Sequence, residues 1–598
     1  MQARRRLAFL YLIVSSCVLA GVLFRFLVNL DSLSLILARN HLVTSSSVEF
    51  SWDTLLPSQT LAWTKCYPGR ECARLIVPLN YSDPDGPEAA IALIRRPSYL
   101  PEGSKDYRGP VLFNPGGPGG SGVDMVWKAA DLLSTIIGPQ FDIVGFDPRG
   151  VSRSTPQSIF FKTEVEQELW GWKSDLIVNN SDSGVARTWA RAQVIGKLAA
   201  ESDGGYLRHI NTENTARDML HIVKAHGQSK LQYWGMSYGT VLGATFAALF
   251  PDNVGRLVID GVVDSEDYYA TLWSKNLLDT DKTLETFLTG CVEAGPEDCA
   301  FWAPTPKDIN NNLTTLYDSL RSRPLPIKTD QTYGVLEYGH LKAFVLAALY
   351  SPYALYPALA QALARLAAGD GSLLFSFLFP PPYQCACGPS EAPYDNLREA
   401  QISILCNDGD DVPDDLESSQ KYFEELYESS DWAEMWARIR LDCVGWPKFP
   451  KDHFQGPFVA NTSYPILLVG NTADPVTPLW AAKKMSKGFN NSVVLTQDSP
   501  GHCSVAAPSV CTMNHIRNYF IHGTLPEPST VCEPIGKPFP ESIQVASPFG
   551  QSAAGEHATQ DPLMASMSQE DRVLYDAVRE LGKKNIISNP FLGFGPLF

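Results

Sequence analysis

The sequence has no excess of basic residues, no cysteines and histidines spaced as a zinc-ligand set, and no internal repeats. Its formal net charge of −17 argues against a nucleic-acid partner, because nothing in the composition would neutralise phosphates. Only 19% of the residues are charged and 44% are hydrophobic, which excludes a disordered or coiled-coil chain. The 598 residues therefore predict a globular protein that is longer than one ordinary domain and has a large core.

A basic start precedes a long apolar stretch at the N-terminus. MQARRR is followed by an uncharged segment at 7–24, a pattern typical of a secretory signal or signal-anchor. Residues 18–20 (VLA) offer a small-residue cleavage site, but apolar character resumes after Arg25 and runs toward Ala38, long enough to span a bilayer. We expect residues 1–40 to be an uncleaved membrane anchor, with a cleaved signal peptide and a secreted protein as the alternative. In both cases the rest of the chain is translocated into the secretory pathway, as a lumenal or extracellular domain.

Cysteines and glycosylation sequons agree with that compartment. Eleven of the twelve cysteines follow the apolar segment, and we expect disulfides rather than metal ligands. Eleven is odd, so at least one thiol should be free, and spacing does not settle the connectivity. The cysteines that come in close pairs are Cys66 with Cys72, Cys291 with Cys299, Cys385 with Cys387, and Cys503 with Cys511. The five N-x-S/T sequons, each an opportunity for glycosylation, lie at Asn80, Asn179, Asn312, Asn461 and Asn490.

Strand-like and helix-like segments alternate from about Trp63, with near-continuous apolar strands. This pattern predicts an α/β fold with a mostly parallel, doubly wound sheet. It pauses after about Asp264, where a long block without obvious core strands has helical patterns, and it returns near residue 463. The predicted domains are a first part of the core at 60–265, an inserted, mainly helical cap at 266–455, a second part of the core at 456–540, and a tail at 541–598 with a short helix near 568–583.

A serine lies between two glycines in the segment LQYWGMSYGTVLGATFAALF. Ser237 follows a strand-like run and precedes a helix-like run, and Gly235 and Gly239 flank it. In a strand–turn–helix elbow the serine is strained and exposes its hydroxyl, and the glycines avoid a steric clash. The alternative is a glycine-rich bend without chemistry, but the flanking elements favour a nucleophile.

A base and an orienting acid should follow a serine nucleophile in the chain. Asp474 comes directly after a predicted strand in ILLVGNTADPVTP, and His502 follows the next strand in DSPGHC. Active sites of open α/β sheets gather at these strand ends, so the order Ser237, Asp474, His502 predicts a catalytic triad. Turn formation by the acid and a surface role for the histidine are the alternatives. Rival residues are less well placed: His515 and His522 fall in or after a predicted helix, and Asp498 is too near His502 along the chain.

A glycine-rich loop supplies the fourth part of the site. NPGGPGGSG at 114–122 follows a predicted strand, where such folds provide one backbone N–H of an oxyanion hole. We expect Gly117 to give this N–H and Tyr238, the residue after the nucleophile, to give the second. The turn at 147–150 (DPRG) should shape the pocket without taking part in the chemistry.

Several segments together resemble one branch of a known superfamily. NPGGPGGSG, FDIVGFDPRGVSRS, YWGMSYGTVLGATFAALFPDNVGRLVIDGVVD, LLVGNTADPVTP and GHCS are similar to the tripeptidyl-aminopeptidase-like branch of the prolyl-iminopeptidase-related α/β-hydrolases, as is the tail GTLPEPSTVCE. The resemblance covers roughly residues 60–535 and thins through the cap. It implies that Ser237 is the nucleophile, His502 the general base and acid, and Asp474 its orienting partner.

The resemblance also implies an exopeptidase that acts on short peptides or aminoacyl amides and whose cap carboxylates hold the free amine of the substrate. The acidic stretch after residue 263 offers five carboxylates, Asp264, Glu266, Asp267, Asp279 and Asp281. The sequence does not choose among them; Glu266 and Asp267 are taken as candidates, and solvated charge on a cap helix is the alternative for each.

We therefore predict a serine hydrolase that works by acyl transfer, needs no metal or organic cofactor, and meets the membrane only if its N-terminal segment is uncleaved. An esterase, lactonase or thioesterase with the same triad is the first alternative for its function. A non-catalytic, membrane-tethered binding protein is the second, and the presence of all three triad residues argues against it.

Overall fold

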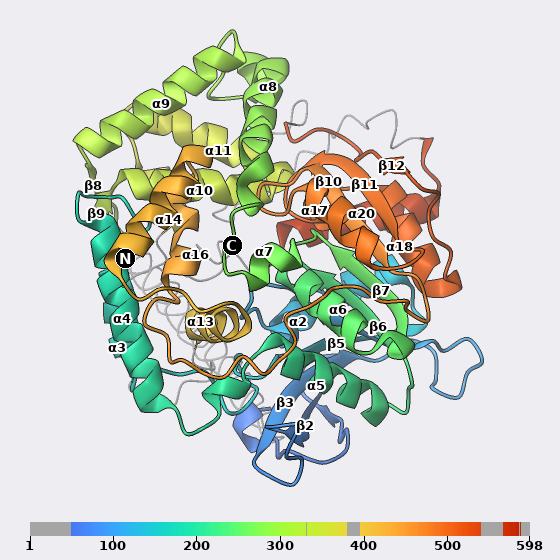
Figure 1. Cartoon of the computed structure of the whole chain (residues 1–598). Coiled ribbons are helices and arrows are strands. Elements are labelled where there is room, and N and C mark those ends of the chain that lie inside the picture. The colour runs from blue at the N-terminus through green and yellow to red at the C-terminus, as the bar shows by residue number, and fades with distance from the viewer. Residues whose placement is uncertain (1–49, 331, 379–394, 540–565, 585, 588–598) are drawn as a thin grey trace, which may run out of the picture. The chain divides into compact units, whose positions relative to one another are not determined.

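The computed structural model describes residues 50–330, 332–378, 395–539, 566–584 and 586–587 (Figure 1). The chain divides into two units at Thr54 and Leu55, and of the first unit only residues 50–54 are described, with a short 3-10 helix at Trp52–Thr54. The predicted N-terminal anchor and the pair Cys385/Cys387 lie outside the described residues. Among the helices that are described, none is long and apolar enough to cross a membrane.

A ten-stranded sheet forms the centre of the second unit, in the order β1-β2-β3-β5-β4-β6-β7-β10-β11-β12. Strands β1, β2, β3 and β5 pair antiparallel to one another, and from β5 to β12 all pairs are parallel. The strands are β1 (Thr64–Lys65), β2 (Glu71–Pro78), β3 (Glu88–Arg96), β4 (Gly109–Asn114), β5 (Phe141–Phe146), β6 (Leu231–Met236), β7 (Val254–Asp260), β10 (Leu467–Ala473), β11 (Val493–Pro500) and β12 (Val531–Cys532). The α/β fold with a mostly parallel sheet is confirmed.

Burial explains why these segments form central strands. Every residue of β4 and β5 is buried, as expected for parallel strands that are covered on both faces. The outer strand β2 instead alternates buried and half-buried residues along its second half. The surrounding helices include α2 (Gly122–Ile137), α5 (Thr212–Ala225), α6 (Tyr238–Leu249), α17 (Leu479–Met485), α18 (Val510–His522) and α20 (Gln569–Lys583). Helices α2, α18 and α20 pack against one another, and so do α5 and α6.

A mainly helical block lies between β7 and β10 in the chain, and we call it the cap. Its helices are α7 (Ser265–Tyr269), α8 (Thr280–Asp298), α9 (Pro306–Ser322), α10 (Tyr338–Tyr350), α11 (Pro352–Ala367), α12 (Ser372–Leu378), α13 (Leu397–Asp408), α14 (Leu416–Ser429), α15 (Ala433–Trp436) and α16 (Arg438–Leu441). A separate hairpin, β8 (Leu325–Lys328) with β9 (Tyr333–Leu336), interrupts them. Every residue of helix α10 except the half-buried His340 is buried, so the helix forms part of the cap's own core.

The cap also receives helices from earlier in the chain, which the sequence interpretation had counted with the core. Helices α3 (Glu164–Trp172) and α4 (Gly184–Ser202) follow β5, and α4 packs against α14 and α16 of the cap. Figure 1 shows α4 beside α14.

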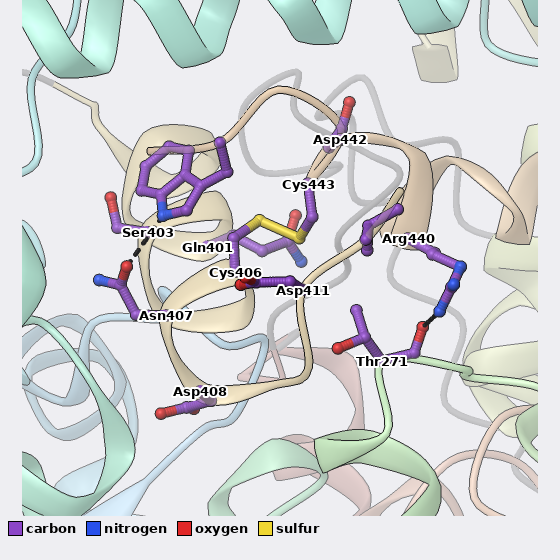
Figure 2. Close-up of a disulfide and its surroundings, with 12 residues drawn as sticks. Thr271, Gln401, Ser403, Cys406, Asn407, Asp408, Asp411, Arg440, Asp442 and Cys443 are labelled. Atoms are coloured by element: carbon purple, nitrogen blue, oxygen red, sulfur yellow. Dashed lines mark hydrogen bonds between the residues drawn. A yellow bond between two sulfur atoms is a disulfide. The ribbon is translucent and has the colours of Figure 1, made fainter. Parts of the chain in front are cut away.

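Four disulfides join the described cysteines: Cys66–Cys72, Cys291–Cys299, Cys406–Cys443 and Cys511–Cys532. The close pair Cys503/Cys511 is not bonded, because Cys511 on α18 meets Cys532 of the edge strand β12. Cys503 is a buried free thiol. Cys406–Cys443 spans 37 residues and ties the end of α13 to the chain after α16 (Figure 2).

Candidate active site

Ser237 lies at a strained turn between β6 and α6. Its backbone has φ 57° and ψ −123°, a left-handed region that side chains other than glycine rarely adopt. A Cβ atom at Gly235 would lie 2.3 Å from the carbonyl oxygen of Gly239, and one at Gly239 would lie 2.9 Å from Asn114 Oδ1. The glycines that flank the serine are therefore required by the close crossing of strand and helix. The turn is held by the Ser237 amide, which donates to the Asp260 carbonyl at 3.0 Å.

Asp474 and His502 form a buried pair at neighbouring strand ends. Asp474 comes directly after β10, His502 lies two residues after β11, and His502 Nδ1 is 3.0 Å from both carboxylate oxygens of Asp474. The side chains are 1% and 0% exposed, so water does not compete for this contact. Since Nδ1 faces the carboxylate, Nε2 is the ring nitrogen left for a substrate or a hydroxyl.

The surroundings of Asp474 favour its ionised form. Burial alone would raise the pKa of Asp474, but the His502 ring and hydrogen bonds from the amides of Cys503 and Val476 outweigh it and hold the pKa below its ordinary value. Thr477 donates to the same carboxylate from its amide at 2.8 Å and from its hydroxyl at 2.7 Å.

Ser237 and the His502 loop meet at one carbonyl. The Asp260 carbonyl oxygen, at the end of β7, accepts the Ser237 amide at 3.0 Å and the Cys503 thiol at 3.3 Å. Cys503 Sγ is in turn 3.8 Å from each ring nitrogen of His502. The structure therefore brings the serine, the histidine and the acid into one neighbourhood.

Two buried side chains hold the loop that carries His502, and the sequence interpretation did not identify either of them. Asn471 Nδ2, on β10, donates to the carbonyls of Gly501 and Cys503 at 2.8 and 2.7 Å, one on each side of the histidine. The Asp260 carboxylate accepts the Ser504 amide at 2.8 Å and the Ser504 hydroxyl at 2.5 Å. Burial raises the pKa of Asp260 to about 6, although hydrogen bonds from Ser504 and Trp234 oppose this shift.

The glycine-rich loop approaches Ser237 closely. Gly116 and Gly117 have φ 86° and 109°, and a Cβ atom at Gly116 would lie 2.5 Å from the carbonyl oxygen of Met236. The Asn114 side chain accepts the Gly116 amide at 2.9 Å and so anchors the start of this loop. Gly117 and Tyr238, the two expected oxyanion donors, line the same small pocket as Ser237.

This pocket has a volume of about 20 Å³ and is lined largely by apolar and aromatic side chains. The lining residues are Gly117, Ser237, Tyr238, Val263, Trp273, Asn276, Tyr350, Trp436, Ile439, Val476 and Thr477. Tyr350 and Thr477 also contact His502: the Tyr350 ring meets the imidazole edge-on with centroids 5.0 Å apart, and the Thr477 hydroxyl lies 3.1 Å from Nδ1. The residues around His502 therefore form part of the wall that faces Ser237.

The start of the cap is fastened to the loop that carries Asp474. Asn276, Thr280 and Thr283 donate from their side chains to the carbonyls of Val476, Pro475 and Ala473, at 2.8, 2.6 and 2.9 Å. The Lys282 ammonium donates to the Thr472 carbonyl. This row of side chains from the residues 276–283, which we call the cap base, satisfies the carbonyls on both sides of the acid.

The proposed amine-binding acids Glu266 and Asp267 do not line the pocket, and both have partners within the protein. Glu266 is exposed and forms an ion pair with Lys484 at 2.8 Å, and the same ammonium binds both oxygens of Asp264. Asp267 accepts the Ser274 hydroxyl at 2.8 Å and the Lys275 amide at 3.2 Å.

The other two acids of that stretch differ from each other. Asp281 accepts the indole N–H of Trp432 at 2.9 Å. The half-buried Asp279 accepts the Thr283 hydroxyl with its backbone carbonyl, but its carboxylate has no hydrogen bond or ion pair with any part of the chain that is described. Burial raises its pKa, Lys282 opposes the shift, and Asp474 adds to it. Asp279 is therefore the member of the set whose carboxylate is available to a ligand.

The remaining candidate residues lie away from this chemistry. Asp498 lies within β11 and accepts the Thr472 hydroxyl at 2.7 Å, and His515 and His522 lie on α18. His515 is close to Cys511 and Cys532, but these two cysteines form a disulfide and are not free to hold a metal. Asp147 is buried and accepts the Ser121 hydroxyl and the Val123 amide, so it shapes the start of α2.

The sequons differ in their surroundings. Asn312, Asn461 and Asn490 are exposed and Asn80 is half-buried. Asn179 differs from them, because its Nδ2, the atom that would carry a glycan, donates to Glu434 Oε1 at 2.9 Å. Glu434 is 1% exposed.

Comparison with known proteins adds to this geometry. Residues 109–298 match the family described as alpha/beta hydrolase fold, and residues 429–532 match the family described as TAP-like protein. The chain is 28% identical over 494 residues to Serine protease Hip1 of Mycobacterium tuberculosis, covering 79% of this chain and 91% of that protein. It is 28% identical over 487 residues to Tripeptidyl aminopeptidase of Streptomyces lividans, covering 79% and 85%. Carboxylesterase B of M. tuberculosis is 27% identical over 474 residues, covering 77% and 86%.

The fold and these matches define the chain as an α/β-hydrolase, and its enzyme class as that of the serine hydrolases. The match of residues 429–532 to the TAP-like model agrees with the resemblance seen in the sequence.

Proposed function

We propose that the protein is a serine aminopeptidase that cleaves short peptides or aminoacyl amides through an acyl-enzyme on Ser237. The observation that carries this proposal is the buried Asp474–His502 pair beside the strained turn at Ser237. The Cys503 thiol, on the residue after His502, and the Ser237 amide donate to the same Asp260 carbonyl. The names of two relatives, a serine protease and a tripeptidyl aminopeptidase, support a peptide substrate.

In the proposed mechanism Ser237 Oγ attacks the scissile carbonyl while His502 Nε2 takes its proton. Asp474 holds the imidazole by Nδ1 and stabilises the imidazolium. The amides of Gly117 and Tyr238 stabilise the oxyanion, and each donor is worth roughly 10²–10³ in rate. His502 then protonates the leaving amine, and water, activated by the same nitrogen, hydrolyses the acyl-enzyme.

We assign recognition of the free amine to Asp279, in place of Glu266 and Asp267. Asp279 lies three residues after Asn276, which lines the pocket, and its carboxylate has no partner among the described residues. Asp279→Asn should raise KM for peptides with a free amine by about tenfold, the loss of one charge-assisted hydrogen bond. Asp281→Asn is the matched control, since that carboxylate is bound to Trp432. Equal effects of the two variants, or an equal effect on N-blocked substrates, would contradict the assignment.

The experiment for the proposed function compares wild type with Ser237→Ala. The substrates are fluorogenic amides of Ala, Pro and Ala-Ala-Pro with free amines, an N-blocked tripeptide amide, and a short acyl ester. We expect cleavage of the free-amine substrates that disappears in the variant, together with loss of fluorophosphonate labelling. Labelling that persists without Ser237 would contradict its assignment as the nucleophile. Cleavage of the ester alone would contradict the peptidase function.

An esterase acting on a small metabolite is the second candidate. The observation in its favour is the pocket beside Ser237, whose lining has no Asp, Glu, Lys or Arg. A relative named Carboxylesterase B agrees with it. The ester in the same substrate panel tests this candidate directly.

We further propose that the catalytic unit acts in the secretory pathway, anchored by the N-terminal segment or released after its cleavage. The four disulfides among the described residues support an oxidising compartment. Fractionation of cells that express the full chain into membrane and medium tests it: recovery in the cytosol would contradict the proposal.

A further inference from the structure

A strained segment forms part of the wall of the pocket that contains Ser237. Directly after α7, Thr271 and Trp273 both have φ 53°, in the left-handed region that non-glycine residues rarely adopt. Two such residues in three positions persist only where the surrounding structure holds them in place, and such strain gathers at functional sites. We call residues 271–273 the wall loop, because Trp273 is part of the pocket wall.

The cap holds all three carbonyls of the wall loop. Arg440 Nη1 donates to the carbonyl of Thr271, as Figure 2 shows. The Tyr422 hydroxyl donates to the carbonyl of Leu272 at 2.7 Å, and the Trp436 indole donates to that of Trp273 at 3.0 Å. These three donors come from α16, α14 and α15, so the conformation of the wall loop depends on the cap.

The wall loop and one of its donors form an aromatic barrier next to Ser237. The rings of Trp273 and Trp436 are 6.3 Å apart between centroids, and both line the pocket. Tyr268 packs on Trp273 from behind, with centroids 5.1 Å apart, so the indole has little room to withdraw. Trp273 and Trp436 are 5% and 3% exposed.

The barrier leaves little space. A cavity of about 20 Å³ holds roughly one water molecule. Its lining offers hydroxyl, amide and apolar groups, but no charged side chain, so a charged group would lose its hydration there without compensation. The size and the charge of the side chain or alkyl chain next to the scissile carbonyl should therefore both be selected, whereas the free amine of a peptide substrate is assigned to Asp279.

We propose that Trp273 and Trp436 determine specificity by restricting the side chain or alkyl chain next to the scissile carbonyl, beside Ser237, to a small uncharged one. This inference rests on the proposed acyl transfer at Ser237 and holds for a peptide bond and for an ester alike. The two indoles select the substrate by size and charge, and Arg440 and Tyr422 hold the wall loop in place.

The test uses Trp273→Leu and Trp436→Leu, with Trp446→Leu as the matched control. Trp446 is a buried cap tryptophan whose indole donates to Asn407, and it does not line the pocket. The substrates are 4-nitrophenyl acetate, butyrate, hexanoate and octanoate, together with 4-nitrophenyl hydrogen succinate as the charged counterpart of the butyrate.

We expect the ratio of kcat/KM for octanoate to that for acetate to rise at least tenfold in either pocket variant and to stay unchanged in Trp446→Leu. A few methylenes accommodated or excluded in an apolar pocket are worth this much. The charged succinate should be hydrolysed at least tenfold more slowly than butyrate by wild type. An unchanged chain-length ratio in both pocket variants would overturn the assignment of size selection, and rapid succinate hydrolysis would overturn selection against charge.

A second measurement guards against partial unfolding. Both rates of labelling, by a short-chain and by a long-chain alkyl fluorophosphonate, scale with the folded fraction of the sample. Their ratio is therefore independent of that fraction, and it should rise in the pocket variants even if the yield of folded protein falls. Ester hydrolysis that persists in Ser237→Ala would refute the proposed function itself. Hydrolysis that depends on Ser237 without a shift in either ratio would refute only the role of the indoles.

Discussion

Replacing Asn471 by leucine should displace His502 from its working position, although none of the three proposed triad residues is changed. The carbonyl of Gly501 loses its only described donor, at a cost of about 1–3 kcal/mol, whereas the carbonyl of Cys503 keeps the Ala506 amide at 3.2 Å and loses about 0.5–1.5 kcal/mol. Leucine also removes Asn471 Oδ1, a buried acceptor that has no partner, which returns about 1 kcal/mol. The net loss is about 1–3 kcal/mol, concentrated on the loop that presents His502.

If this loop shifts before the domain unfolds, the fraction of folded molecules with His502 in its proper place falls about tenfold for each 1.4 kcal/mol of lost stabilisation. The fluorophosphonate labelling rate of Ser237 should therefore drop by about 10–100-fold, measured per folded molecule. Asn407→Leu is the control, because Asn407 Nδ2 donates to the carbonyls of Leu207 and Ile210 at 2.7 and 2.8 Å, outside the pocket lining. Asn407→Leu should lose at least as much unfolding free energy, because it also leaves the buried Trp446 indole N–H without its acceptor, Asn407 Oδ1. A labelling rate reduced equally in both variants, or in neither, would refute the reasoning.

Two further predictions concern single groups. Burial raises the pKa of Asp260 from its ordinary 3.8 to about 6, so its contribution to stability is present below about pH 4 and is lost as the pH rises through 6, by about 3 kcal/mol. Asp260→Asn cannot ionise, and its Tm should fall less than that of wild type between pH 4 and pH 7; parallel curves would contradict the shift. In a glycosylating host, Asn179→Gln should not change the apparent mass, since Asn179 Nδ2 is bound to buried Glu434, whereas Asn312→Gln should lower it. A mass decrease in the Asn179 variant would show that this hydrogen bond does not protect Asn179 in the protein made by that host.

The parts of the site that follow local rules were predictable from the sequence. The elbow at Ser237 depends on neighbours within two residues, because the backbone crossing there excludes a Cβ at Gly235. Asp474 and His502 follow predicted strands directly, and the ends of parallel strands meet at one edge of the sheet, so their encounter could be foreseen.

Residues that act through distant contacts could not be predicted in this way. Asn471 and Asp260 belong to apolar strands. Nothing in the sequence pattern distinguishes a polar residue that anchors a loop from any other buried polar residue in such a strand. The acids of the cap look alike in sequence, and only their three-dimensional partners, such as Lys484 beside Glu266, separate occupied carboxylates from Asp279. The pairing of Cys406 with Cys443 depends on how the cap helices pack, which spacing along the chain does not encode.

The hydrogen bonds of the cap base limit how this enzyme can be re-engineered. Exchange of caps between related hydrolases is an obvious route to new specificity, with junctions placed where the central sheet ends. Here a junction before Asn276 would discard the donors that satisfy the carbonyls around Asp474, so a chimera would inherit a weakened triad along with its new pocket. A graft that begins after Thr283 keeps those donors, and makes residues 276–283 part of the catalytic scaffold rather than of the exchangeable module.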